Sequence, residues 1–426
     1  MMKHYKIFAF IPVIFTFLIS SFSFEKSTQS HSSSGPIDSI LAAHPECFAK
    51  ITANPKKYKI QIIYTQINRD ADNKPSFHQY NYLLDSNNYF YCASLVKLPC
   101  SILALEKLNA LNIPGLTKSS KMITDSGGPC QRRTLIDTSA ANGVPSIEHY
   151  IKKMLLVSDN LAYGRVYEFL TPDYIHQRLS ELSYPNIRIV HRFDGGCQGI
   201  ENLQTNSCSF YDEQGKLLYK QEQQVSSKTY LHPLGKKIEV GKAYINNKGK
   251  KINEPKDFSS LNYIGLQNIN DILKNLIFQP YLSNKNKYNI SENDRKFLLK
   301  YLSMYPRESD YPKYNPTTYF DSYKKYFMYG DTKKPITDTN IRIFNIVGQS
   351  YGFMVDCAYI VDFQNKIEFM LSAVIYTNEN EIMNDGIYEY KTIALPYLSK
   401  LGTCIYNYEL KRPKKQYPDL KDFCQF

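Results

Sequence analysis

Strand-like segments lie near both ends of this 426-residue chain, with helix-like segments between them. Short runs rich in β-branched and aromatic residues indicate the strands. These runs are Lys59–Ile67, Tyr80–Asp85, Ile341–Val347, Tyr351–Val361 and Glu368–Thr377. Because early and late strands can share one sheet, their order predicts an antiparallel sheet assembled from both ends around a helical region. The expected fold class is therefore α+β rather than an alternating βαβ fold.

Apolar residues recur at helical spacing in the middle of the chain and again near its end. The predicted helices are Ser94–Leu111, Ser146–Leu156, Leu161–Leu170, Thr171–Leu182, Leu266–Phe278, Glu292–Met304 and Ile387–Leu401. Pro99 lies near the start of the first of them. Since proline has no backbone donor, we expect this helix to begin irregularly.

The first residues have the layout of a secretory signal peptide. Lys3 and Lys6 precede the apolar run Ile7–Ile19, and Ser21-Phe22-Ser23 offers a cleavage site with small residues. We therefore expect a signal peptide at residues 1–23 and a tether and N-terminal segment at 24–50. The product would be exported, periplasmic or extracellular, without a stable membrane span. An uncleaved anchor is the alternative, although the run is shorter than the roughly 20 residues a span needs.

Residues 51–426 are expected to form one domain, which we expect to be monomeric. The chain is 43 % hydrophobic and 22 % charged, as globular domains are. Within it, residues 210–258 carry turn signals at 212–215 and 246–249 and many lysines, which predicts an inserted, exposed pair of hairpins. These lysines would form a solvated face or contact an anionic envelope polymer. The net charge of +12 fits anionic partners, but no nucleic-acid motif accompanies it, so no nucleic-acid partner is expected.

Ser94-Leu95-Val96-Lys97 places a lysine one helical turn after a serine. A serine becomes a nucleophile when a base removes its proton, and burial can adapt a lysine to that role. The apolar neighbours Phe90 and Leu98 favour such burial. The same pattern recurs at Ser23 with Lys26 and at Ser322 with Lys325, where we expect surface residues because no apolar frame surrounds them.

Ser158-Asp159-Asn160 is a second candidate motif, in a polar break between two predicted helices. The hydroxyl can relay a proton to a leaving group, and the amide can bind a substrate amide. The alternative is a helix N-cap, because all three residue types favour that position and Leu161 starts an apolar run.

Together and in this order, the two motifs resemble those of the class A β-lactamases and their serine-hydrolase relatives. The resemblance spans about residue 51 to the C-terminus. It implies a β-lactamase/transpeptidase-like fold, with an antiparallel sheet flanked by helices plus a helical subdomain. It also implies acyl transfer to Ser94 with Lys97 as base, Ser158 as proton shuttle and Asn160 as substrate ligand. The substrate would be a β-lactam or a cell-wall peptide amide, and neither cofactor nor metal is expected.

The remaining family motifs are altered in this chain. Gly348 keeps the glycine of the Lys-Thr-Gly motif, but Ile346 stands at its lysine position, which puts efficient β-lactam turnover in doubt. Arg342 or a lysine of the hairpin region could replace that cation. The resemblance assigns the Gln349 amide to the oxyanion hole beside the Ser94 amide.

Asp194 matches the carboxylate that activates water for deacylation, with Glu201 as a competing candidate. A loop carboxylate paired with Arg192 is the alternative interpretation of Asp194. Two further functions stay open: a cell-wall peptidase or esterase of the same fold, and a catalytically silent envelope-binding protein.

Overall fold

The computed structural model describes residues 1–2, 35–127, 132–193, 196–197, 199–283 and 287–424. The chain divides into two units, residues 1–32 and 33–426, and all the secondary structure reported below belongs to the second. The expected signal peptide therefore lies outside the described residues apart from residues 1 and 2, as do Ser23 and Lys26.

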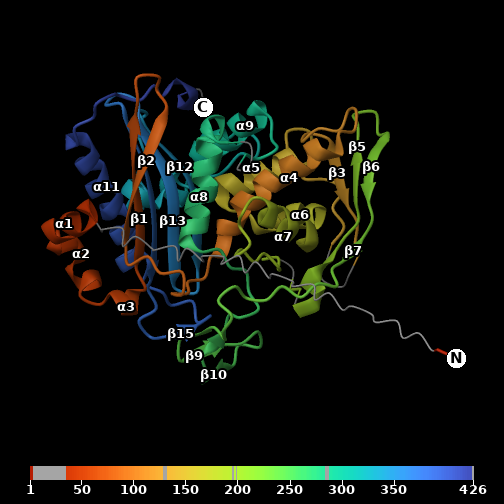
Figure 1. Ribbon diagram of the computed structural model, residues 1–426, viewed down its shortest axis with the longest axis horizontal. Helices are drawn as coiled ribbons and strands as arrows, with labels where there is room; N and C mark the ends of the chain where they lie inside the picture. Colours follow the sequence, from red (N-terminus) through yellow and green to blue (C-terminus); the bar gives the residue numbers. More distant parts are fainter. Residues whose placement is uncertain (3–34, 128–131, 194–195, 198, 284–286, 425–426) are drawn as a thin grey trace. The chain divides into compact units, whose positions relative to one another are not determined.

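A five-stranded antiparallel sheet with the order β12-β13-β14-β1-β2 is the centre of the fold (Figure 1). Its strands are β1 (Gln61–Arg69), β2 (Pro75–Tyr82), β12 (Ile341–Ser350), β13 (Phe353–Asp362) and β14 (Ile367–Tyr376). The register places Ile63 opposite Ser372, so an early strand pairs directly with a late one. The prediction of one α+β sheet built from both ends of the chain is confirmed.

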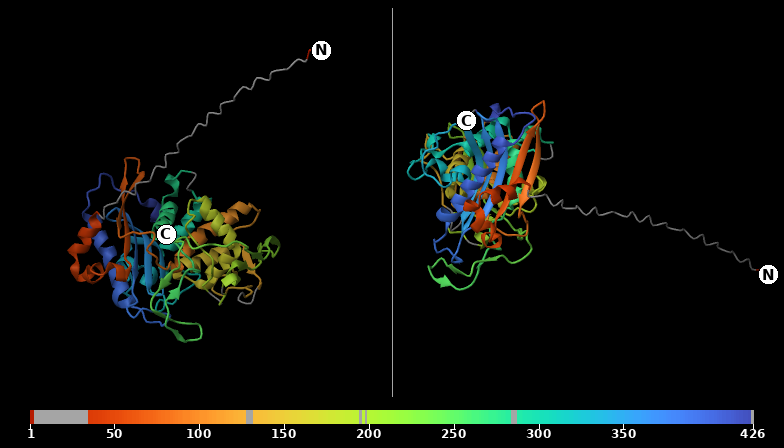
Figure 2. Two further views of the ribbon diagram at one scale, coloured as in Figure 1. Left: turned by 60° about the horizontal axis from the view of Figure 1, so that its bottom comes forward. Right: turned by 90° about the vertical axis from the view of Figure 1, so that its left-hand side faces the viewer.

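Helices cover both faces of the sheet (Figures 1 and 2). One face packs against α1 (Pro36–Ala43), α2 (Pro45–Thr52) and α11 (Leu395–Lys411). The other packs against α8 (Leu266–Ile277) and α9 (Glu292–Ser303), beyond which lie α4 (Lys97–Leu111), α5 (Ile147–Val157), α6 (Asn160–Leu170) and α7 (Pro172–Glu181). Strands β13 and β14 are buried along their whole length, because both of their faces are covered.

Most predicted helices form within a few residues of the expected bounds, and two differences stand out. The N-terminal segment is helical from Pro36, where the sequence indicated only a tether and an unassigned segment. The last helix runs ten residues beyond Leu401, as far as Lys411. Short elements complete the chain: α3 (Pro55–Tyr58), α10 (Tyr326–Tyr329), η1 (Ala93–Val96), η2 (Gly199–Leu203), η3 (Gln279–Tyr281), η5 (Pro306–Glu308), η6 (Asp321–Lys324), η7 (Tyr390–Ala394) and η8 (Lys421–Phe423).

Residues 210–258 do form two hairpins, but the expectation that both are exposed is wrong. In the first, β5 (Cys208–Tyr211) lies between β6 (Leu217–Gln221) and β3 (Lys121–Thr124), so Phe210 is fully buried in the core. The second joins β9 (Ala243–Ile245) to β10 (Lys251–Ile252), and β9 also pairs with β15 (Ile382–Met383). The remaining short strands are β4 (Gln204–Thr205), β7 (Gln224–Val225), β8 (Glu239–Val240) and β11 (Lys256–Asp257).

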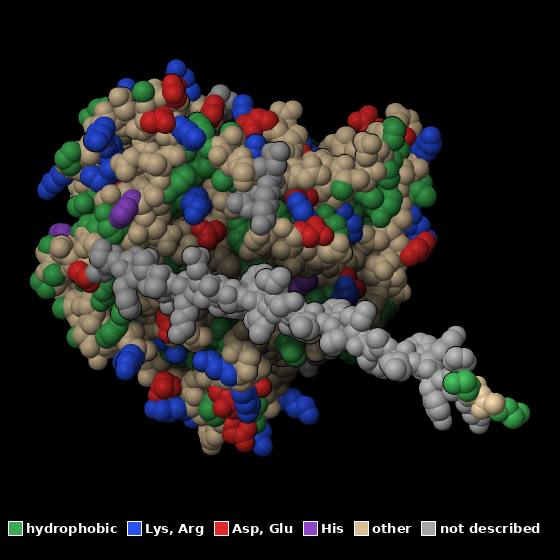
Figure 3. All heavy atoms as spheres, in the orientation of Figure 1, with side chains coloured by type: hydrophobic (Ala, Val, Ile, Leu, Met, Phe, Trp, Pro, Cys, Tyr) green, Lys and Arg blue, Asp and Glu red, His purple; other side chains and the backbone are tan. Residues whose placement is uncertain are grey.

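The surface around the second hairpin carries charges of both signs. Figure 3 shows lysine and carboxylate side chains intermixed at the lower edge, where β9 and β10 lie. Lys237 pairs with Glu239 at 2.7 Å, and Lys242 pairs with Glu381. No helix among the described residues is long and apolar enough to cross a bilayer.

Candidate active site

Ser94 is the one partly exposed residue in an otherwise buried segment of the chain. From Tyr89 to Glu106 every other residue is buried. Ser94 lies in η1, the short 3-10 turn that precedes α4, and Ala93 before it has a positive φ of 45°. Such a conformation is unfavourable for a residue with a Cβ and is held here by the surrounding packing. The irregular helix start predicted from Pro99 is observed as this turn.

Lys97 is fully buried, as the apolar frame predicted. Its Nζ lies 3.0 Å from Ser94 Oγ and 2.9 Å from Ser158 Oγ. It also donates to the Ser158 carbonyl at 2.5 Å and to Asn160 Oδ1 at 2.7 Å. The Phe193 ring lies over the same nitrogen at 5.4 Å. The lysine thus connects the hydroxyls of the two sequence motifs.

The segment Ser158-Asp159-Asn160 caps a helix, as the alternative interpretation proposed, and its two outer residues also contact Lys97. Asp159 is the N-cap of α6, since its carboxylate accepts from the Ala162 amide at 2.8 Å. Ser158 terminates α5 in a left-handed conformation with φ of 62°. The two outer residues are thereby free to point at Lys97, while the middle residue fixes the helix.

Gly348 on β12 is required by a close approach of two backbone segments. A Cβ at this position would lie 2.5 Å from the carbonyl oxygen of Cys92, in the loop before Ser94. The glycine therefore lets β12 lie directly against the nucleophile loop. Gln349 follows and lines the same cavity as Ser94, and its side-chain oxygen accepts from Tyr326 Oη at 3.1 Å.

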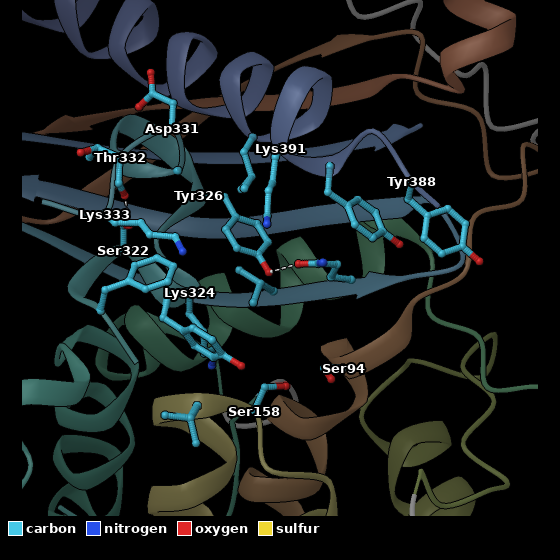
Figure 4. Close-up of a pocket in the computed structure, with 18 of the residues that line it drawn as sticks. Ser94, Ser158, Ser322, Lys324, Tyr326, Asp331, Thr332, Lys333, Tyr388 and Lys391 are labelled. Atoms are coloured by element: carbon cyan, nitrogen blue, oxygen red, sulfur yellow. Dashed lines mark hydrogen bonds between the residues drawn. The ribbon is translucent and has the colours of Figure 1, made fainter. Parts of the chain in front are cut away.

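A cavity of about 960 Å³ opens beside these residues. Ser94 and Ser158 lie together on one wall, across from Tyr326 and Lys391 (Figure 4). The wall that the sequence did not predict comes from two segments. It comprises Phe320, Ser322, Tyr323, Lys324, Tyr326, Gly330, Asp331, Thr332, Lys333, Gly386, Tyr388, Tyr390, Lys391, Thr392 and Leu395. Apart from Ser322, which begins the second Ser-x-x-Lys pattern, these residues belong to no recognised motif, because tertiary packing brings them to the site.

The second Ser-x-x-Lys pattern, at Ser322 and Lys325, contradicts its prediction as a surface pair. Both residues are buried. They do not form a dyad, however, because Ser322 Oγ donates to the Thr332 carbonyl. Lys325 Nζ instead donates to Leu302, Ile343 and Asn345 at 2.6 to 2.8 Å.

Neither Arg342 nor a lysine of residues 210–258 supplies a cation to the cavity in place of the lysine that Ile346 replaces. Ile346 is buried in the core. Arg342 forms a bidentate pair with Glu308 at 2.8 and 2.9 Å and does not line the cavity. None of the lysines of residues 210–258 lines it either. The lysines of the described cavity wall are Lys324, Lys333 and Lys391.

Asp194 lies outside the described residues. The residues that precede it contact Lys97 and the helical region. Phe193 reaches Lys97, and the His191 carbonyl accepts from Tyr163 Oη at 3.1 Å. The guanidinium of Arg192 pairs with buried Glu168 at 2.7 Å. Glu201, the competing carboxylate, lies in η2 and does not line the described cavity.

Residues 49–236 match the model of a family described as the beta-lactamase enzyme family. This segment contains Ser94, Lys97, Ser158 and Asn160. The similarity to this family covers less than half of the chain. The antiparallel sheet flanked by helices, with the helical region beside it, agrees with the α+β arrangement that the sequence predicted.

Several solved structures are similar to this chain over most of its length. A β-lactamase from Sphaerobacter thermophilus is 10 % identical with a TM-score of 0.47, covering 88 % of this chain and 98 % of that one. A class A β-lactamase from Clostridium kluyveri is 11 % identical with a TM-score of 0.45, covering 84 % and 97 %. The protein PBP-A is also 11 % identical with a TM-score of 0.45, covering 87 % and 97 %. No curated protein sequence matches the chain.

Proposed function

We propose that this chain is an exported serine hydrolase that forms an acyl-enzyme on Ser94. The observation that carries the proposal is the position of Lys97 Nζ, 3.0 Å from Ser94 Oγ and 2.9 Å from Ser158 Oγ. A base must lie within about 3 Å of the proton it abstracts, and both hydroxyls meet that requirement. Ser94 reaches the cavity, so a substrate carbonyl has access to it.

In the proposed acylation, neutral Lys97 removes the Ser94 proton as Oγ attacks the carbonyl carbon of an amide or lactam. The amides of Ser94 and Gln349 hold the resulting oxyanion. Ser158 then passes a proton from Lys97 to the leaving nitrogen as the carbon–nitrogen bond breaks. Asn160 orients the substrate, and no cofactor takes part.

Water then releases the acyl group, and Asp194 is proposed to activate it. The substrate is a β-lactam or a cell-wall peptide amide. Lys333 and Lys391 line the cavity, which favours a substrate with an anionic group. A cell-wall peptidase of the same fold is the second candidate. The volume of the cavity, about 960 Å³, favours it because such a space admits more than a small lactam.

Covalent labelling tests the nucleophile. The purified mature chain is incubated with a fluorescent penicillin and, separately, with a fluorophosphonate. We expect labelling of the wild type and of Ser322→Ala, the serine of the other Ser-x-x-Lys pattern, but none of Ser94→Ala. Equal labelling of Ser94→Ala would show that another residue is the nucleophile. No labelling of the wild type by either probe would favour a silent envelope-binding protein.

Turnover separates the two candidate enzymes. Hydrolysis of a chromogenic cephalosporin by the labelled wild-type chain supports a β-lactamase. A long-lived adduct without hydrolysis supports a peptidase that deacylates slowly on β-lactams, and release of a terminal residue from a cell-wall peptide then identifies it.

A further inference from the structure

Lys324 is a buried cation in the cavity wall that neither sequence motif includes. It ends η6 and is 4 % exposed. Its Nζ donates to the carbonyl oxygen of Leu155 at 2.6 Å. Leu155 lies in the last turn of α5, three residues before Ser158. The lysine therefore connects the η6 wall of the cavity to the helix end that carries the proposed proton shuttle.

The end of α5 needs such a contact. The last carbonyls of a helix have no intrahelical donor, and a cation near them is favourable. Ser158 leaves the helix with φ of 62°, a conformation that costs roughly 1 kcal/mol or more for a residue with a Cβ. Within the turn, the Ser158 amide donates to the Met154 carbonyl at 3.1 Å. A donor on the neighbouring Leu155 carbonyl holds the turn in this strained form.

The backbone of Lys324 is itself fixed from β12. Asn345 Nδ2 donates to the Lys324 carbonyl at 2.6 Å and to Asp356 Oδ1 at 2.8 Å. Asn345 Oδ1 accepts from Lys325 at 2.8 Å. The Asp356 carboxylate also accepts from the Tyr326 amide at 3.1 Å. The lysine is thus held at both ends by buried partners.

We propose that Lys324 is a positioning residue that holds the C-terminal turn of α5 and thereby keeps Ser158 Oγ against Lys97. Lys324 supplies a buried cation from η6. The position on β12 at which the sequence motif has a lysine is occupied by Ile346 in this chain. The inference rests on the proposed function of Ser94 and deepens it, because it names what places the proton shuttle.

Protonation of Lys324 gives this role a measurable signature. Burial lowers the pKa of Lys324 to about 7, and the negative charge of Asp356 opposes the shift. Burial also raises the pKa of Asp356 to about 7. Lys325 lies beside Lys324 in sequence, and Lys97 lies across Ser158. Asp331, Lys333 and Lys391 are further charged residues that line the same cavity. Since an ammonium holds a carbonyl more strongly than an amine, we expect acylation to slow as the pH rises through about 7.

The test measures the rate of Ser94 acylation by a fluorescent penicillin from about pH 5 to 9. Lys324→Met should acylate at least about tenfold more slowly and lose the decrease near neutral pH. Lys324→Arg, which stays charged, should also lose that decrease but keep more of the rate. Asp356→Asn removes a negative charge that favours the protonated form of Lys324, so the decrease should persist but move to lower pH if Lys324 is the titrating group.

Lys107 offers a matched control. It is also a largely buried lysine, and it donates to the Phe169 carbonyl at the end of α6 at 2.5 Å and to Gln221 Oε1 at 2.7 Å. Burial lowers its pKa to about 8. Because it lies outside the described cavity lining, Lys107→Met should lose stability while its acylation rate and pH profile match the wild type.

Hydrogen exchange gives a readout that needs no activity. The amides of Ser158 and Asp159 should exchange at least about tenfold faster in Lys324→Met than in Lys107→Met. Exchange in Lys324→Met that equals the exchange in Lys107→Met would overturn the inference. A wild-type pH profile in either Lys324 variant would also overturn it, and neither result would contradict the role of Ser94 as the nucleophile. If Lys324→Met does not fold, the profile of Lys324→Arg decides. If Ser94 of the wild type is not labelled but the amides of Ser158 and Asp159 exchange faster in Lys324→Met, only the proposed function is contradicted.

Discussion

At the scale of single residues, the tightest constraint on the site is the approach of Gly348 to the Cys92 carbonyl. Because a Cβ would lie 2.5 Å from this backbone oxygen, Gly348→Ala must push β12 and the nucleophile loop apart. We expect the free energy of unfolding to fall by about 1–3 kcal/mol and acylation of Ser94 to slow by at least about tenfold. Chemical denaturation and the labelling time course measure the two effects.

Gly265→Ala is the control for the glycine substitution. A Cβ there would meet side-chain atoms alone, Asn268 Oδ1 at 3.1 Å and Tyr263 Oη at 3.5 Å. The position lies at the start of α8 and outside the described cavity lining. Its labelling rate should equal that of the wild type. If Gly348→Ala labels as fast as Gly265→Ala, the close approach does not determine how Ser94 reacts.

The residues of the site differ in how far the sequence could predict them. Ser94, Lys97, Ser158 and Asn160 were predicted as one group, and the structure brings them together because each motif is local and both meet at Lys97. Lys324 could not be found in this way. Its contact with Leu155 joins residues far apart in the chain, and its role depends on the end of another helix.

At the scale of elements, a buried histidine should make the packing of α7 sensitive to acid. His176 Nδ1 donates to the Pro172 carbonyl at 2.7 Å, and its Nε2 accepts from the Ile189 amide at 3.2 Å. Its ring stacks on Tyr230 with centroids 3.8 Å apart. A second proton would break the Ile189 contact, and burial lowers the pKa of His176 from 6.5 to about 4.

The sign of the pH dependence follows from these pKa values. Between about pH 6.5 and 4 the unfolded chain binds a proton at His176 that the folded chain does not bind. Stability from this group is therefore complete above pH 6.5 and falls by about 3 kcal/mol as the pH drops to 4. Urea unfolding at the two pH values measures the loss, which should be smaller by about this amount in His176→Gln.

Exposed His78 provides the control for this prediction. His78→Gln should lose as much stability on acidification as the wild type. An acid-induced loss that is the same in His176→Gln and His78→Gln would show that His176 titrates normally in the folded chain.

Elements were predictable where their pattern is periodic. The bounds of α8 and α9 differ from the predictions by one residue, because an apolar stripe of several turns specifies a helix wherever it packs. The short helices α1 and α2 were missed, since eight residues give too little periodicity. The burial of β5 was missed for another reason: it depends on pairing with β3, which is remote in sequence.

At the scale of the whole described unit, the sheet makes the two ends of the chain depend on each other. Strand β1 lies between β2 and β14, and it pairs with β14 from Gln61–Val374 to Gln66–Phe369. The apolar clusters on the two faces of the sheet both draw on strands from the two ends. We therefore expect one cooperative unfolding transition for residues 33–426 rather than separate transitions for the helical region and the sheet.

The family match ends at residue 236, so a fragment of residues 49–236 tests this dependence. It retains Ser94, Lys97 and Ser158 but loses β12, β13 and β14, and a two-stranded remnant of the sheet is only marginally stable in water. We expect the fragment to unfold without a sigmoidal transition and to remain unlabelled by penicillin. Adding a second fragment of residues 237–426 should restore labelling if the two associate. Labelling of residues 49–236 alone would show that the helical region folds without the sheet and that β12 is dispensable for the reactivity of Ser94.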